Sequence, residues 1–107
     1  MVEFALRFAG KVPIAVASGG HRSVVLKTLG ALGIVDRFQT IIGAEDYPRG
    51  KPFPDSFLEA ARRLGVAPEK CLVFEDTHTG VTAAKAAGMQ WVLVPALRRD
   101  ETRRRDP

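Results

Sequence analysis

Two adjacent carboxylates, Glu75 and Asp76, are the first residues whose types suggest chemistry. Ionised neighbours repel each other, so such a pair is costly unless a cation or hydrogen-bond donors lie nearby. Mg²⁺ prefers oxygen ligands, and it needs only one or two carboxylates when phosphate oxygens and water complete its shell. The pair is therefore a candidate magnesium site. The alternative is that Asp76 or the following Thr77 caps a helix.

Two further segments contain groups that suit a phosphate. Ser18, Gly19 and Gly20 combine a hydroxyl with glycine amides at the expected start of a helix, which is a typical anion site. Lys51 lies in the segment Gly-Lys-Pro-Phe-Pro-Asp, where prolines restrict the backbone around an ammonium that could meet a phosphoryl oxygen. Helix capping by Ser18 and a merely solvated lysine are the alternatives. His21 is expected at the surface, at the start of a helix.

Alternating sequence patterns predict the elements that position these groups. Short apolar runs predict strands at 12–17, 38–42, 71–74 and 91–94. Helical spacing of apolar residues predicts helices at 21–32, 56–64 and 77–87, with another short helix at 2–9.

The helix boundaries and the fold class follow from these patterns. Asp55 is expected to cap the second of the three longer helices, and Gly65 to end it. The strand runs are continuously apolar, which indicates burial on both faces in a parallel sheet. Strands alternating with helices predict a doubly wound α/β sheet. Ligands of such sheets gather beyond the carboxyl ends of the strands, and all three candidate segments lie there.

Composition limits the remaining possibilities. The chain has 107 residues, of which 46% are apolar and 26% charged, so it forms at most one small globular domain. Its one cysteine, Cys71, excludes an internal disulfide and is expected to be a buried small hydrophobe. No run of apolar residues is long enough to span a membrane, and the N-terminus lacks a secretory signal, so a cytoplasmic location is expected.

The net charge of +4 raises the question of nucleic-acid binding. Five arginines lie in the tail at 97–107, which has no apolar periodicity. A solvated tail is therefore favoured over an arm that binds nucleic acid.

The order and spacing of the three segments carry a family resemblance. The stretches VASGG, GKPFPDSFLEAARRLGVAPEKCLVFED and THTGVTAAKAAGM resemble the haloacid dehalogenase superfamily, and within it the beta-phosphoglucomutase-like phosphatases. The resemblance covers about residues 10–96. It implies a Rossmann-like core that uses Mg²⁺ to transfer a phosphoryl group between a small metabolite, such as a sugar phosphate, and an aspartate.

The resemblance also implies a role for each matching residue. Ser18 and Gly19 would bind the phosphoryl group. Lys51 would be catalytic and phosphate-binding, because it neutralises the phosphate charge and orients the nucleophile. Glu75 and Asp76 would bind Mg²⁺.

The sequence departs from the family in one serious respect. It has no Asp-x-Asp motif, which in the family ends the first strand and supplies the nucleophile and the general acid–base. The resemblance thus implies a core that lacks its central strand and its cap domain. Residues 1–9 would be the helix that returns from the cap, 10–96 a partial core, and 97–107 a flexible tail.

Two functional readings follow from this departure. The first is a phosphatase or phosphomutase core that is inactive by itself. The second is a non-catalytic module that binds phosphate or Mg²⁺, or is completed by a strand from a partner. Because unpaired strand edges can pair with other chains, that partner could be a second copy, through a homodimer or strand exchange.

Overall fold

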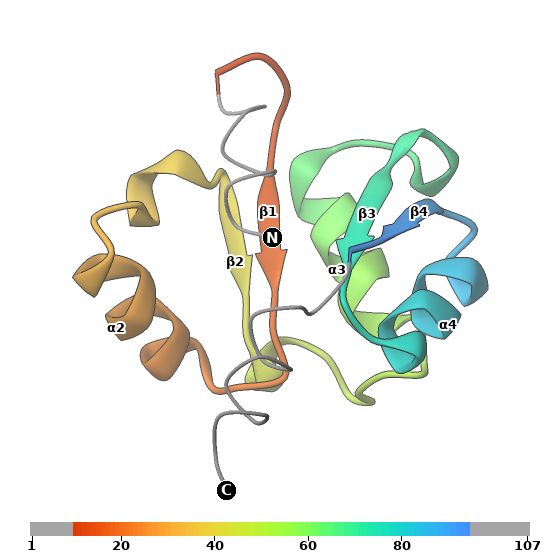
Figure 1. The fold of residues 1–107 in the computed structure, drawn as a ribbon, viewed down its shortest axis with the longest axis horizontal. Helices are drawn as coiled ribbons and strands as arrows, with labels where there is room; N and C mark the ends of the chain where they lie inside the picture. The colour runs from red at the N-terminus through yellow and green to blue at the C-terminus, as the bar shows by residue number, and fades with distance from the viewer. Residues whose placement is uncertain (1–9, 95–107) are drawn as a thin grey trace, which may run out of the picture.

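A computed structural model of the chain describes residues 10–94 and contains alternating strands and helices (Figure 1). The described strands are β1 (Ala15–Ala17), β2 (Thr40–Ile42), β3 (Leu72–Glu75) and β4 (Gln90–Leu93). The described α-helices are α2 (Arg22–Ala31), α3 (Asp55–Leu64) and α4 (His78–Ala86). Short 3₁₀ turns are η1 (Val35–Arg37), η2 (Ala44–Asp46) and η3 (Pro68–Lys70). The predictions for 1–9 and 97–107 lie outside the described residues.

The strands form two parallel pairs. β1 pairs with β2, with Val16 opposite Ile41, and β3 pairs with β4, with Phe74 opposite Val92. This arrangement confirms the predicted α/β class with parallel strands. Among residues 10–94, β1 and β3 each pair with one strand only, so the two sheets are separate. That the family's central strand is missing between them stays a prediction.

Local residue chemistry explains where the helices begin and end. α3 ends at Gly65, which adopts φ +71° and donates to two carbonyls of the last turn, as predicted. α4 begins after Thr77, whose side chain accepts a hydrogen bond from the Gly80 N–H. The expected cap of α3 is wrong, because Asp55 is its first helical residue and its carboxylate binds the Arg49 guanidinium instead.

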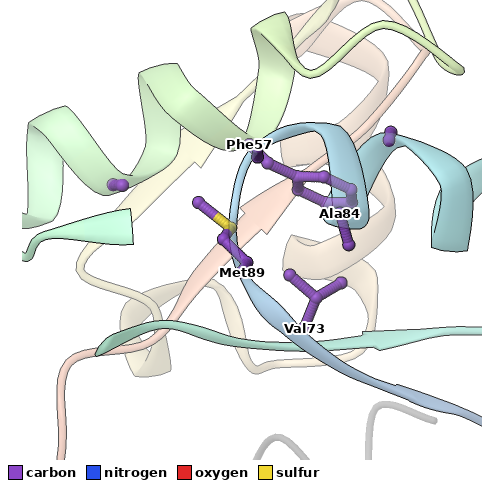
Figure 2. Close-up of a cluster of buried hydrophobic side chains, with 7 residues drawn as sticks. Phe57, Val73, Ala84 and Met89 are labelled. Carbon is purple, nitrogen blue, oxygen red and sulfur yellow. The ribbon is translucent and has the colours of Figure 1, made fainter. Parts of the chain in front are cut away.

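A hydrophobic core joins α3, α4 and β3 (Figure 2). Phe57 of α3 lies in one cluster with Val73 of β3 and Ala84 of α4, and Met89 closes it from the segment before β4. α3 also packs against β1 and β2. The small alanines of α4 allow this close approach of helix and strand. The core therefore fixes α3, and with it the loop before α3, relative to the end of β3.

Burial differs from the sequence expectation at several positions. In α2 only Leu29 is buried, whereas Val24 is 59% exposed and Leu32, the residue that caps the C-terminus of the helix, is 60% exposed. All four residues of β4 are exposed, so this strand is not buried on both faces within the described structure. Cys71 is only half-buried, at the edge of the core. Between residues 10 and 94, no helix is long and apolar enough to cross a membrane.

Candidate functional site

A pocket of about 340 Å³ opens where the β1 and β2 strands end. Its lining residues come from the loop after β1 and from the segment between β2 and α3: Gly19, Ala44, Tyr47, Pro48, Gly50 and Lys51. Two residues predicted to bind phosphate, Gly19 and Lys51, therefore share one pocket. Small residues and glycine backbone form most of its wall, which allows a ligand to approach the main chain.

The loop after β1 is held by hydrogen bonds to the β2 side of the pocket. The Ser18 N–H donates to the Ile42 carbonyl at 2.9 Å, and the Ala44 N–H donates to the Gly20 carbonyl at 2.8 Å. Within the loop, the Ser18 hydroxyl accepts from the Gly20 N–H at 3.0 Å. Ser18 thus stabilises its own loop, and its hydroxyl hydrogen stays available to a ligand.

Lys51 reaches from the loop before α3 to the end of β3. Its ammonium lies 2.9 Å from Glu75 Oε2 and 4.9 Å from the centre of the Phe57 ring. The Lys51–Pro52 peptide bond is cis. Because the side chain is 26% exposed and lines the pocket, the ammonium is held in place but remains accessible to an anion. A fixed cation in a partly enclosed site is suited to stabilise phosphate charge.

Glu75 is buried, and donors surround its carboxylate. Oε1 accepts from the Asp76 N–H and from the Thr77 hydroxyl, each at 3.1 Å, while Oε2 accepts from Lys51. Burial by itself would raise the pKa of Glu75, but the hydrogen bond and charge of Lys51, with the two other donors, hold it below its ordinary value of 4.5. Glu75 is therefore ionised at neutral pH.

Gly80 leaves room for this carboxylate. A Cβ atom at position 80 would lie 2.0 Å from the Glu75 Cδ and 2.3 Å from its Oε2. No larger residue fits there unless Glu75 moves. The first turn of α4 therefore packs its bare backbone against the carboxylate that holds Lys51.

The donor set can be compared with the needs of Mg²⁺. Residues 10–94 contain no group of three or more His, Cys, Asp or Glu side chains that could hold a metal ion. Mg²⁺ accepts a smaller protein contribution, because water and phosphate oxygens complete its octahedron. A carboxylate has about four acceptor positions, and the donors to Glu75 use three of them. One acceptor position of Glu75 is left for a metal ion, and Asp76, the other predicted ligand, follows it directly at the end of β3.

Tyr47 is a site residue that sequence reasoning missed. It lines the pocket, and its hydroxyl donates to the Ser18 carbonyl at 2.7 Å. Burial, and secondarily the Asp46 charge, raise its pKa above the ordinary value of 10.0, so the hydroxyl stays protonated and donating at neutral pH. An aromatic residue in a loop belongs to no periodic pattern that could reveal its role. The one indication in the sequence is that Tyr47 lies four positions before Lys51. His21 lies exposed at the start of α2, as expected.

Comparison with known proteins supports the resemblance drawn from the motifs. The family model for haloacid dehalogenase-like hydrolases matches residues 2–88. Fructose-1-phosphate phosphatase YqaB of Escherichia coli is 38% identical over 97 residues, which are 91% of this chain and 52% of that protein. A probable pseudouridine-5'-phosphatase of Drosophila melanogaster is 48% identical over 93 residues, covering 81% of this chain and 40% of that protein.

Solved structures show the same fold. A beta-phosphoglucomutase from Clostridium difficile superposes with a TM-score of 0.79 at 29% identity, covering 94% of this chain and 45% of that one. CbbY from Rhodobacter sphaeroides, solved with phosphate, gives 0.80 at 28% identity, covering 89% and 44%. The chain thus spans about half the length of the relatives it matches. With a family model that covers most of its residues, the chain belongs to the haloacid dehalogenase-like hydrolases.

Proposed function

We propose that this chain is the phosphate- and magnesium-binding part of a phosphatase or phosphomutase core that acts on a small phosphorylated metabolite. The observation that carries the proposal is the placement of Lys51, which lines the same pocket as Gly19 and is bonded to Glu75. This arrangement links the candidate phosphate loop with the candidate metal site. A sugar phosphate is the favoured substrate class, since YqaB, which this chain resembles, is named a fructose-1-phosphate phosphatase.

Each group has a role in this proposal. The Ser18 hydroxyl and the Gly19 N–H bind phosphoryl oxygens, and Lys51 neutralises their charge and is the catalytic residue present in this chain. Asp76 and the remaining acceptor position of Glu75 hold Mg²⁺. When bound, the ion would supply charge stabilisation to the phosphoryl oxygens. The protein's own contribution is to position the phosphate between a fixed ammonium and a fixed backbone loop.

The chain alone is expected to be inactive, because its sequence has no Asp-x-Asp motif to supply the nucleophile. The Asp46 carboxylate binds Arg22 and Arg63, and the Asp55 carboxylate binds Arg49. Asp36 lies in η1, which precedes β2. It is therefore near the amino end of that strand and not at its carboxyl end. The aspartyl-phosphate that the family resemblance implies would need a nucleophile from outside this sequence.

Phosphate binding is the direct test. Calorimetric titration of inorganic phosphate into the chain with Mg²⁺ should detect binding. Lys51→Met should weaken it about tenfold or more, since a hydrogen bond to a charged group contributes about 1.5–3 kcal/mol. Lys27→Met changes an exposed lysine on α2 and is the matched control, expected to bind like the wild type. Equal affinities for the wild type and Lys51→Met would rule out the proposed site.

A turnover assay tests the expected inactivity. With a chromogenic phosphate ester and Mg²⁺, the chain should release no phosphate above background. Turnover that Asp76→Asn abolishes would contradict the prediction, because it would show catalysis without an Asp-x-Asp motif.

A second candidate function is an assembly module completed by a strand from a partner. The observation that favours it is the separation of the two sheets, which leaves β1 and β3 with one paired neighbour each among residues 10–94. An unpaired strand edge accepts another strand through backbone hydrogen bonds. Sedimentation would decide whether copies exchange strands. A monomer at all concentrations, unfolding in one cooperative step, argues against pairing between copies.

A further inference from the structure

Three hydrogen bonds join residues 18–20, which follow β1, to the β2 side of the pocket, and one of them comes from a side chain. Two of the three are the backbone hydrogen bonds of Ser18 and Gly20 to the β2 side of the pocket. Any sequence could make these bonds. The third is the hydrogen bond from the Tyr47 hydroxyl to the Ser18 carbonyl at 2.7 Å, which is the shortest of the three and spans 29 positions of the chain. Of these three bonds, it alone can be removed by changing one side chain.

The Ser18 carbonyl and the Gly19 N–H belong to one peptide unit. That unit is planar, and in the trans form its C=O and N–H point in opposite directions. A hydrogen bond that fixes the carbonyl therefore fixes the direction of the N–H as well. The same bond polarises the amide and makes the N–H a stronger donor. Between residues 10 and 94, the Gly19 N–H itself donates to no group.

The Ser18–Gly19 peptide unit needs an external hydrogen bond to fix its orientation, because residue 19 is a glycine. Gly19 has no Cβ, and a Cβ placed on it would meet nothing within 4 Å, so neither its own side chain nor packing restricts it. Glycine in an open loop can rotate among many conformations. The orientation of its peptide then depends on the groups bonded to it.

We propose that Tyr47 is a positioning residue for the phosphate-binding loop: it donates to the Ser18 carbonyl, fixes the Gly19 N–H, and so raises the affinity of the pocket for phosphate. The inference rests on the proposed function, because it takes the Gly19 N–H as a phosphate donor. It adds a residue that belongs to none of the three motif segments. Tyr47 also lines the pocket, so the residue contributes both shape and order to the site.

Tyr47→Phe tests the proposal, because it removes the hydroxyl and keeps the ring. The full chain with Mg²⁺ is titrated with inorganic phosphate while amide resonances are followed by NMR. The dissociation constant should rise about fivefold, the worth of one net hydrogen bond. The ¹⁵N order parameter of Gly19, measured without phosphate, should fall, because its peptide unit is no longer held.

Thr82→Val is the matched control. The Thr82 hydroxyl also donates to a backbone carbonyl, that of His78 at 3.0 Å, but it is exposed on α4. Its loss should leave the phosphate affinity and the Gly19 order parameter unchanged. Equal loss of affinity in both variants would mean a general destabilisation and would overturn the proposal.

The phosphate titrations of the wild type and of Tyr47→Phe test the proposed function and the role of Tyr47 separately. A wild-type chain that binds no phosphate would overturn the proposed function. A wild-type chain that binds phosphate, with a Tyr47→Phe variant that matches it in affinity and in the Gly19 order parameter, would overturn the inference alone.

A labelling experiment avoids any change of fold. Tyr47 is the only tyrosine of the chain, so biosynthetic 3-fluorotyrosine places a single ¹⁹F probe at the pocket. Its resonance should shift as phosphate is added, with the same half-saturation as the Gly19 amide. A resonance that stays fixed while phosphate binds would contradict a role for Tyr47.

Discussion

The Lys51 ammonium lies 2.9 Å from Glu75 Oε2, and this ion pair joins the segment that follows β2 to the end of β3. The two strands belong to different sheets, so the contact connects parts of the molecule that no ladder of backbone hydrogen bonds joins within residues 10–94. Both partners are largely buried, with side-chain exposures of 26% for Lys51 and 8% for Glu75. Removal of one side chain should therefore leave the other as a buried charge without its partner.

Lys51→Met should destabilise the chain by about 2 kcal/mol, because it leaves a buried carboxylate without its counter-charge. Lys51→Met combined with Glu75→Gln should cost less than the sum of the single changes. Urea unfolding followed by the fluorescence of Trp91, the only tryptophan, measures the free energies. Additive effects would show that the two side chains do not interact in solution.

Gly80→Ala should destabilise the chain by about 1–3 kcal/mol, because the new methyl group would overlap the Glu75 carboxylate. It should also weaken phosphate binding, since Lys51 loses a fixed partner. Gly30→Ala is the opposite case: it lies in α2 with nothing within 4 Å of the added Cβ. That variant should gain about 0.5–1 kcal/mol from helix propensity. Destabilisation by both changes would contradict the packing described at Gly80.

Thr77→Ala should cost about 1 kcal/mol, because it removes the side-chain cap of α4. Thr77→Ser keeps the hydroxyl and should retain most of the stability. Thr79→Ala, at an exposed position in the same turn, gives the baseline for shortening a threonine there. Thermal unfolding of the three variants is sufficient, and equal melting temperatures for the alanine and serine variants at position 77 would exclude a capping role.

Acid should destabilise the chain partly through Asp46. The hydrogen bond from the Gly43 N–H, with further help from Arg63 and Arg22, holds the pKa of Asp46 below its ordinary value of 3.8. The unfolded chain therefore takes up a proton before the folded chain does. The stabilisation is complete above about pH 4 and is lost as the pH falls through the lowered pKa.

Melting temperatures of Asp46→Asn, measured from pH 6 to pH 2, should reveal how much the ionised Asp46 carboxylate stabilises the chain. The variant should melt lower than the wild type at pH 6, and the difference should shrink below pH 4. Asp36→Asn, at an exposed aspartate of η1, is the matched control, and its melting temperature at pH 6 should stay close to that of the wild type. A difference for Asp46→Asn that stays constant with pH would show that its charge adds nothing to stability.

Much of the fold could be predicted because local chemistry determines it. Gly65 ends α3 through a left-handed conformation that glycine adopts easily, and Val81, Ala84 and Ala87 face the core at helical spacing as expected. The parallel pairing followed from the alternation of strands and helices. These features depend on neighbours in sequence or on a regular period, and both are readable without coordinates.

The errors arose where distant residues decide the outcome. Asp55 has the right type for a helix cap, but Arg49 binds its carboxylate. Val24 and Leu32 have the right spacing for burial in α2, but no described element covers them. Gly80 falls within the predicted helix at 77–87, and the sequence does not reveal that the Glu75 side chain fills the space beside it. None of these contacts has a signature in the local sequence.

α3 has a role that its length does not suggest. It packs against β1 and β2, while its Phe57 and Ala61 lie in the cluster that contains Val73 and the alanines of α4. The helix therefore packs against both halves of the molecule, the half that contains β1 and β2 and the half that contains β3 and α4. If α3 came away, each half would lose its apolar contacts with this helix. Unfolding should accordingly be all-or-none, with the two halves losing their native signals at the same denaturant concentration. A folding intermediate with one half intact would have to keep α3, and so could form only by exposing the apolar side of that helix to water.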